Sequence, residues 1–195
     1  PEQVQISVKT RLGISSAGEF PQILRIYEKY PLAELIIHPR VREDFYGNHP
    51  DLEAFEEAFM QCSFPVCYNG DLFCAGDLEQ FIKTHEKVKR IMLGRGLLAN
   101  PGFLVNALTG QKTEKATVKA FHDRLYRDYL RVMSGEKNTL FKMKELWAYW
   151  QFLFAGGEKQ LKRIRKATSA SEYESAVEMI FEQCLFLPEG AFRME

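Results

Sequence analysis

Long apolar runs are missing from this 195-residue sequence, and so is a net charge of either sign. No uninterrupted apolar stretch reaches about 18 residues, so we expect no membrane-spanning helix and no membrane partner. We also expect no secretory signal, and the chain opens with Pro1 and not with an initiator methionine. Hydrophobic residues make up 46% and charged residues 27%, which is typical of a globular protein and excludes disordered and low-complexity classes.

Cysteine and histidine are scarce, with four residues of each type. Cys62, Cys67 and Cys74 are five and seven residues apart, without a histidine at ligand spacing, so we expect no metal site. We interpret the cysteines as reduced thiols of a cytoplasmic protein. No Ser-His-Asp combination and no general acid is evident.

Short apolar runs alternate with amphipathic stretches over the first 108 residues, which predicts consecutive βα units. The runs are 26 to 30 residues apart, close to the length of one βα unit, at roughly 30 residues. This spacing indicates a parallel sheet covered by helices, either doubly wound or part of a (β/α)8 barrel. The expected strands are 4–10, 34–38, 64–68 and 90–93, and the expected helices are 20–30, 52–60, 76–82 and 97–108.

Polar residues follow each of the four expected strands, and this distribution favours the barrel. The carboxyl ends of barrel strands form one rim that carries the active site, whereas a doubly wound sheet concentrates its ligand groups at one switch point. A complete barrel has eight units, so we expect an α/β fold with a TIM-barrel portion of about four units, residues 1–112. The rim residues, in strand order, are Lys9 and Arg11, His38 and Arg40, Asn69 to Asp71, and Gly94 to Gly96.

These rim residues favour an anionic ligand, because cationic donors recur on two neighbouring strands. Gly94 and Gly96 allow close backbone approach, and the helical segment after them would offer free N–H groups to a phosphate. The alternative is that one or two of the charges are ordinary surface residues. Asn69-Gly70-Asp71 taken alone indicates no more than a turn.

The pattern changes after residue 112, where strand-like runs end. Apolar residues at helical spacing predict an all-α helical bundle over residues 113–195, in which Trp147 and Trp150 belong to the core. Residues 115–166 carry a net charge of +8, against −3 before and −5 after them. Such a block indicates a surface that faces a polyanion, unless it is simply a solvated helical face.

Four motifs, in order and spacing, resemble the tRNA-dihydrouridine synthase family. The resemblance covers about the first 108 residues, and the helical tail is similar to that family's C-terminal domain with weaker motifs. It implies an FMN-dependent oxidoreductase that uses NADPH to reduce the C5=C6 bond of specific uridines in tRNA. The motifs are Lys9-Thr10-Arg11-Leu12-Gly13, His38-Pro39-Arg40, Tyr68-Asn69-Gly70-Asp71 and Gly94-Arg95-Gly96-Leu97-Leu98-Ala99-Asn100-Pro101.

The resemblance also implies roles for individual residues. Lys9 matches the lysine at the flavin ring, and His38 matches the rim histidine that contacts FMN. Arg11 matches a position near the flavin and the target uracil, and Arg40 one near the cofactor phosphate or the tRNA. Asn69, Gly70 and Asp71 match the first phosphate-side loop, and Gly94 and Arg95 match the second. The candidate tRNA contacts of the basic block are Lys142, Lys144, Lys162, Arg163, Arg165 and Lys166.

The sequence departs from the family's pattern in one respect. The family's proton donor is a cysteine on a loop in the first half of the barrel, and none of the four cysteines aligns with that loop. We therefore assign no catalytic acid, and expect the chain to be the C-terminal half of the barrel plus a helical tRNA-binding domain, with the N-terminal half as a missing partner. One alternative is a non-catalytic RNA-binding module. Another FMN barrel, acting on small molecules, is disfavoured by the basic block.

Overall fold

The computed structural model describes residues 4–45 and 47–193 of the chain. The chain forms two compact units, neither of which is contiguous in sequence. The sheet unit holds the described residues of 4–72 together with 80–94, and the helical unit holds residues 73–79 and 95–193. Residues 95–112 therefore belong to the helical unit. The division into a barrel domain, 1–112, and a tRNA-binding domain, 113–195, stays a prediction.

Three parallel strands form the centre of the sheet unit, in the order β1 (Ser7–Gly13), β2 (Glu34–Val41) and β3 (Val66–Tyr68). This confirms the parallel α/β architecture. The fourth expected strand, 90–93, is reduced to a single parallel bridge between Tyr68 and Ile91. A sheet of three strands and one bridge is smaller than the four-unit barrel portion that the sequence predicts.

Side chains on one face of this sheet pack against the helices that follow each strand. Leu35 and Ile37 of β2 are fully buried. Tyr68 of β3 lies edge-on to Phe55 of α2 (Leu52–Gln61) at 4.9 Å and is stacked on Phe81 of α3 (Ala75–Thr84) at 4.1 Å. A polar contact joins α1 (Phe20–Tyr27) to β1, because Tyr27 Oη donates a 3.3 Å hydrogen bond to Thr10 Oγ1.

The expected helix 97–108 is divided into α4 (Arg95–Ala99) and α5 (Phe103–Thr109). Pro101 lacks the N–H that a continuing helix needs. A Cβ at Gly102 would overlap the Thr113 side chain, so the close approach of the backbone to Thr113 at this position requires a glycine. Asn100 Oδ1 accepts hydrogen bonds from Gly102 N at 3.1 Å and Thr113 Oγ1 at 2.9 Å. These two bonds stabilise the turn between α4 and α5.

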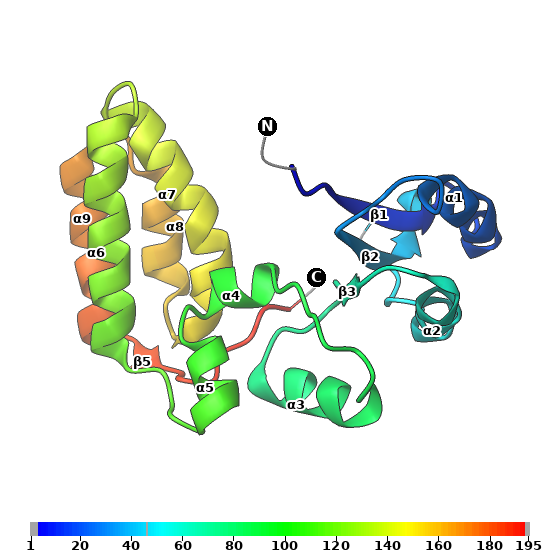
Figure 1. Cartoon of the computed structure of the whole chain (residues 1–195). Helices are drawn as coiled ribbons and strands as arrows, with labels where there is room; N and C mark the ends of the chain where they lie inside the picture. The colour runs from blue at the N-terminus through cyan, green and yellow to red at the C-terminus, as the bar shows by residue number, and fades with distance from the viewer. Residues whose placement is uncertain (1–3, 46, 194–195) are drawn as a thin grey trace. The chain divides into compact units, whose positions relative to one another are not determined.

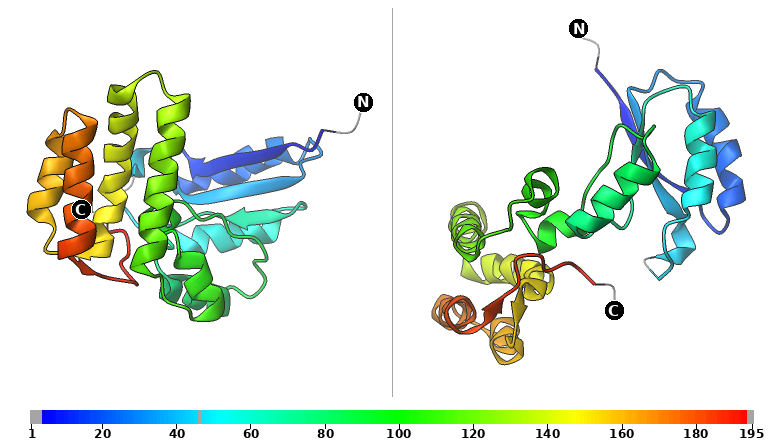
Figure 2. Two further views of the ribbon diagram at one scale, coloured as in Figure 1. Left: turned by 90° about the vertical axis from the view of Figure 1, so that its left-hand side faces the viewer. Right: turned by 90° about the horizontal axis from the view of Figure 1, so that it is seen from below.

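Four longer helices make up most of the helical unit and lie side by side in Figures 1 and 2. They are α6 (Lys115–Val132), α7 (Glu136–Trp150), α8 (Glu158–Lys166) and α9 (Ala170–Gln183). The prediction of helices alone is wrong in one detail, because β4 (Phe154–Ala155) pairs antiparallel with β5 (Leu185–Phe186). Across the described ranges, no helix combines the length and apolar character needed to cross a membrane.

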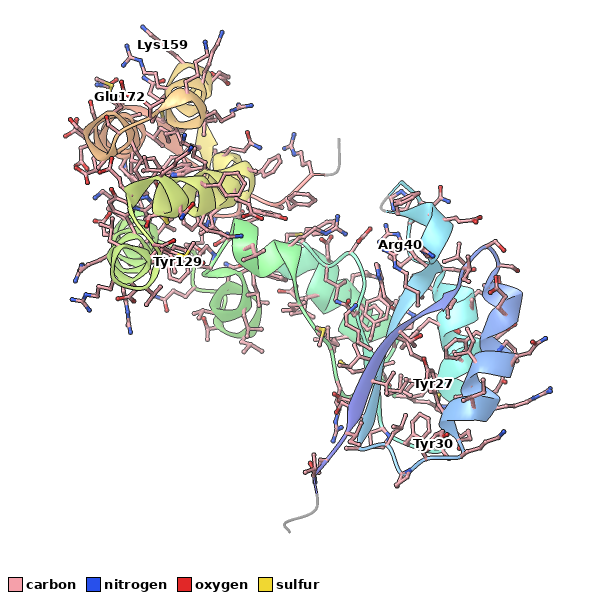
Figure 3. The ribbon with its side chains drawn as sticks, turned by 90° about the horizontal axis from the view of Figure 1, so that it is seen from above. Tyr27, Tyr30, Arg40, Tyr129, Lys159 and Glu172 are labelled. Carbon is pink, nitrogen blue, oxygen red and sulfur yellow. The ribbon has the colours of Figure 1, made fainter. Side chains whose placement is uncertain are left out.

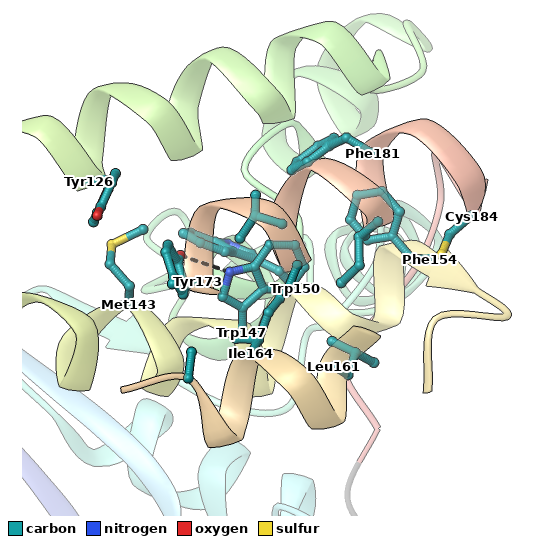
Figure 4. Packing of buried hydrophobic residues seen from close by; sticks show 14 of the residues in the cluster. Tyr126, Met143, Trp147, Trp150, Phe154, Leu161, Ile164, Tyr173, Phe181 and Cys184 are labelled. Carbon is teal, nitrogen blue, oxygen red and sulfur yellow. Dashed lines mark hydrogen bonds between the residues drawn. The ribbon is translucent and has the colours of Figure 1, made fainter. Parts of the chain in front are cut away.

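The core of the helical unit is aromatic and contains one polar network (Figure 4). Trp147 and Trp150 are each 2% exposed, which confirms their expected place in the core. Trp147 Nε1 donates to Tyr173 Oη at 3.0 Å, and Tyr173 Oη lies 2.7 Å from His122 Nε2. Because His122 Nδ1 bonds Asp123 Oδ1 at 2.9 Å, Nδ1 carries the proton, and Tyr173 donates to Nε2. Burial lowers the pKa of His122, so the ring is neutral.

Candidate functional site

Cationic residues gather on the face of the sheet opposite the helices. Lys9 pairs with Ile36 and Arg11 pairs with His38, so their side chains share one face with Cys67, the partner of Ile36 on β3. The prediction that polar residues follow the strands is wrong for the first two strands, because these residues lie inside β1 and β2. Polar residues within a strand are tolerated here because they face away from the helices.

Arg40, near the carboxyl end of β2, and Asp71, three residues after β3, form a buried ion pair. Arg40 Nη1 donates to Asp71 Oδ1 at 2.9 Å, and Arg40 Nη2 lies 2.5 Å from Asp71 Oδ2. The side chains of Arg40 and Asp71 are 0% and 8% exposed, so the pair is shielded from water. The structure thus buries the two residues that the sequence offers as cofactor or tRNA contacts, which favours a role in holding neighbouring groups.

His38 depends directly on this pair for its orientation. Arg40 Nη1 lies 3.1 Å from His38 Nε2, and because a guanidinium only donates, Nε2 must be the acceptor. The neutral ring therefore carries its proton on Nδ1. Burial, followed by the charges of Arg11, Arg40 and Lys9, lowers the pKa of His38 to about 4, while Asp71 opposes the shift.

This pKa predicts an acid-sensitive sheet unit. Between the ordinary histidine value of 6.5 and about 4, the unfolded chain binds the proton that the folded chain excludes. The contribution of His38 is therefore complete above pH 6.5 and is lost as the pH falls toward 4. Urea unfolding at pH 7 and pH 4.5 should show a larger loss for the native protein than for His38→Gln, which keeps an acceptor for Arg40. Parallel losses in both proteins would contradict the assignment.

Arg11 secures the loop that follows β2. Its Nη1 donates to Val41 O at 2.7 Å and to Arg42 O at 3.3 Å, and its Nη2 donates to Phe45 O at 3.0 Å. The neighbouring Lys9 is exposed, and partial desolvation together with the Arg11 charge lowers its pKa. Of the two β1 cations, Arg11 thus organises a loop, and Lys9 presents its ammonium group on the surface.

The loop that follows β1 is held by a carboxylate at the same edge of the sheet. Glu19 accepts backbone hydrogen bonds from Ile14, Ser15 and Ser16, at 3.1, 2.9 and 2.8 Å. These bonds lower the pKa of Glu19 to about 2. The Ser16-to-Glu19 spacing is a capping box, and this pattern in the sequence is a signal that could have indicated the loop.

The two glycine-containing loops differ in how open they are. Asn69 Nδ2 donates to Met92 O at 2.9 Å, which ties the end of β3 to the next segment of the sheet. A Cβ at Gly70 would overlap the Tyr68 hydroxyl, so this glycine serves packing. At Gly94 a Cβ would meet open space, which leaves the backbone accessible from that side.

Arg95 belongs to the helical unit, where aromatic rings enclose it. Its guanidinium carbon lies 5.0 Å from the Phe73 ring centre and 5.2 Å from that of Phe192. Because α4 has only five residues, the helix start after Gly94 contributes little to anion binding. Within residues 4–45 and 47–193, no cluster of three histidine, cysteine or acidic residues could hold a metal ion.

Four of the six candidate tRNA contacts of the basic block lie on α8. Lys162, Arg163, Arg165 and Lys166 are all exposed, and three of them line a groove of about 480 Å³ between α8 and α9. Lys159 and Glu172 are seen on these two neighbouring helices in Figure 3. Since three of these cations sit in the last turn of α8, they also complement its helix dipole.

The two candidate lysines of α7 have protein partners. Lys142 Nζ bonds Glu145 Oε2 at 2.9 Å, and Lys144 Nζ donates to the Ala167 carbonyl just beyond α8. Lys144 thereby connects α7 to the end of α8, so its role in this structure is internal. The tRNA candidates of the sequence therefore separate into an exposed set on α8 and a partnered set on α7.

A family model for dihydrouridine synthase matches residues 2–185. The chain belongs to the dihydrouridine synthase family. It is 27% identical over 130 residues to a probable tRNA-dihydrouridine synthase of Rhizobium leguminosarum bv. phaseoli, covering 65% of this chain and 41% of that protein. It is 29% identical over 102 residues to the tRNA-dihydrouridine(16) synthase of Shigella flexneri, covering 52% of this chain and 32% of that protein.

A relative from Rickettsia bellii, named a probable tRNA-dihydrouridine synthase, is 22% identical over 142 residues, covering 67% of this chain and 41% of the relative. The chain thus matches between about a third and two fifths of the length of these synthases. The family model, which matches most of the chain, establishes family membership.

Proposed function

We propose that this chain is part of a flavin-dependent oxidoreductase that reduces specific uridines of tRNA to dihydrouridine, with NADPH as reductant. The observation that supports this most is the cluster of Lys9, Arg11, His38 and the Arg40–Asp71 pair on the face of a parallel sheet that points away from α1 and α2. Such a face fits the interior of a (β/α)8 barrel, and we propose that residues 1–112 form a portion of one. We also propose a cytoplasmic location, because the proposed substrate is tRNA.

The residues present fit an FMN site by the chemistry of their donors. Lys9 offers an exposed ammonium group, and the Arg40 contact sets His38 with its proton on Nδ1. Gly94 offers accessible backbone where a Cβ would meet open space. Cationic and N–H donors of this kind suit a phosphate and an electron-rich ring system.

In this proposal each residue has a definite task. Lys9 binds at the flavin ring and His38 donates from Nδ1, while Arg40 and Asp71 act as positioning residues beneath them. Asn69 and Gly94 belong to the two phosphate-side loops. The bound flavin supplies the hydride for the uracil ring, and no residue of this chain is assigned as the proton donor.

The test is dihydrouridine formation by the complete product of the gene that encodes this chain. We expect its expression in a bacterial strain without dihydrouridine synthases to restore dihydrouridine, measured by mass spectrometry of digested tRNA. Lys9→Ala should retain flavin about tenfold less well, since it removes a charged donor. Lys29→Ala removes an exposed lysine after α1 and serves as the control. A purified product without flavin and without dihydrouridine formation would overturn the proposal.

The exposed cations of α8 support tRNA as the substrate. A polyanion gains affinity from cations that neutralise its phosphates and release counterions. Lys162, Arg163 and Lys166 line one groove, and Arg165 lies on the same short helix. We therefore propose that α8 contacts the tRNA backbone and that Lys144 supports α8 from within the bundle.

Replacing Arg163 and Arg165 together with alanine should weaken tRNA binding and flatten its salt dependence. The slope of log K against log salt should fall by about 0.8 for each phosphate that is no longer neutralised. The measurement is a tRNA titration at several salt concentrations. Arg25→Ala with Lys29→Ala removes the same charge from the α1 region and should leave the slope unchanged. Equal slopes in both double variants would show that α8 is a solvated surface.

A non-catalytic RNA-binding module is the second candidate, favoured by the concentration of exposed charge on α8. It predicts the same salt dependence but no flavin in the purified protein. The visible absorbance of the flavin therefore separates the two functions in one preparation.

A further inference from the structure

Phe45 is an exposed aromatic residue in a backbone conformation that aromatic residues rarely adopt. Its φ is 48° and its ψ is −100°, and it is the one non-glycine residue with positive φ among those described. Its side chain is 73% exposed, so burial of the ring does not compensate for the strained backbone. Strain of this kind persists only where surrounding groups enforce it, and it is concentrated at functional sites.

Two arginines of the sheet enforce the conformation. Arg11 Nη2 donates to the carbonyl of Phe45 at 3.0 Å. Arg40 Nε donates a 2.6 Å hydrogen bond to the carbonyl of Asn48, which lies three residues after Phe45. Arg40, which the proposed function makes a positioning residue for the cofactor site, and Arg11, which organises the loop after β2, therefore both bond the backbone near Phe45.

Asp44 closes the same loop from within. Its Oδ2 accepts from Val41 N at 2.8 Å and its Oδ1 accepts from Asn48 Nδ2 at 2.6 Å. Val41 and Asn48, on either side of Phe45, are thus both bonded to Asp44, which reduces the backbone entropy that Phe45 would lose when its ring meets a ligand.

Phe45 lies beyond the carboxyl end of β2, at the edge of the sheet where the polar side chains are found. Figure 3 shows Arg40 toward this end of the sheet and Tyr30 at the other end. Tyr30 is similar in kind, because it is aromatic and 61% exposed, but it precedes β2. It therefore provides a matched control for Phe45.

We propose that Phe45 is a stacking platform for a nucleobase of the RNA segment that enters the site, an inference that rests on the proposed function. Reduction of a uracil ring inside a folded tRNA requires that base to leave its stack. Bases in such a segment lose stacking partners, and aromatic side chains replace them in RNA-binding proteins. Stacking is tolerant of sequence, so Phe45 contributes affinity and positioning, while the cations supply the charge dependence.

The test compares Phe45→Ala, Phe45→Tyr and Phe45→Gly in the full chain, with unmodified tRNA transcripts as the probe. Phe45→Ala should weaken binding by about tenfold or more, the usual loss for one stacked base, with the salt slope unchanged. Phe45→Tyr should bind like the native protein. Tyr30→Ala should leave the affinity unchanged.

Unfolding measurements distinguish this role from a structural one. Phe45→Gly accommodates the positive φ, so it should unfold at a higher temperature than Phe45→Ala while binding tRNA equally weakly. Native affinity in Phe45→Ala would overturn the platform and leave the proposed function intact. A native chain that does not bind tRNA at all would overturn the proposed function, and the platform with it. Equal loss of thermal stability in both small variants would assign Phe45 to packing and also overturn the platform.

Discussion

Replacing Asp71 with alanine is expected to lower the free energy of unfolding of the sheet unit by about 3–5 kcal/mol. The change leaves the buried Arg40 guanidinium without its counter-charge, and breaking a buried ion pair from one side has a cost of this size. Asp71→Asn keeps the shape and one acceptor, so it should cost less than Asp71→Ala. Native-state hydrogen exchange at the β2 amides, such as Leu35 N bonded to Pro65 O, measures the loss.

The control for this experiment is the ion pair between Arg90 and Glu34. Their Nη1 and Oε1 atoms are 3.1 Å apart, but the side chains are 51% and 22% exposed. Glu34→Gln should therefore change the stability by less than about 1 kcal/mol. Equal losses in the free energy of unfolding for Glu34→Gln and Asp71→Ala would show that burial of the Arg40–Asp71 pair does not increase its contribution to stability.

Tyr173→Phe is expected to destabilise the helical unit by about 3 kcal/mol. The variant keeps the ring but leaves two buried groups, Trp147 Nε1–H and His122 Nε2, without their common partner. Each buried group left unpaired costs about 1–3 kcal/mol. The sequence has two tryptophans, and both lie in this core, so fluorescence during urea unfolding reports on the helical unit alone.

Tyr126→Phe is the matched control for this second experiment. It removes one 3.1 Å hydrogen bond, from Tyr126 Oη to the exposed Glu174, whose carboxylate can bond water instead. The expected cost is below about 1 kcal/mol. A loss of the same size in both variants would contradict the network as a source of stability.

The sequence predicts the elements of the sheet unit better than their ends. Short apolar runs identify β1 and β2, but polar residues such as Arg11 and His38 look like the end of a strand when a strand is expected to be apolar on both faces. Pro39 suggests the same ending. The register shifts opposite Leu12, where two residues of β2 face one of β1, and a residue without an N–H is tolerated at such a bulge.

The periodicity of apolar residues does not predict very short strands, contacts between residues far apart in the sequence, or an unusual backbone angle. The strands β4 and β5 have two residues each, too few for an alternating pattern. The parallel-strand argument predicts that Lys9, Arg11 and His38 are neighbours, but not that Arg11 bonds carbonyl groups 30 to 34 residues away. Nothing in the residue type of Phe45 indicates its positive φ.

The interleaving of the two units has a consequence for biosynthesis. Residues 73–79 leave the ribosome before the sheet unit is complete, yet their packing partners in the helical unit begin at residue 95. The sheet unit can close once residue 94 has emerged, whereas the first half of α3 must wait for the helical unit. A fragment cut at residue 112 would therefore keep Arg95, whose guanidinium lies over the Phe73 ring, but would lack Phe192, whose ring lies 5.2 Å from that of Phe73. The segment that leads into α3 would then have one aromatic contact fewer, while the strands remain paired.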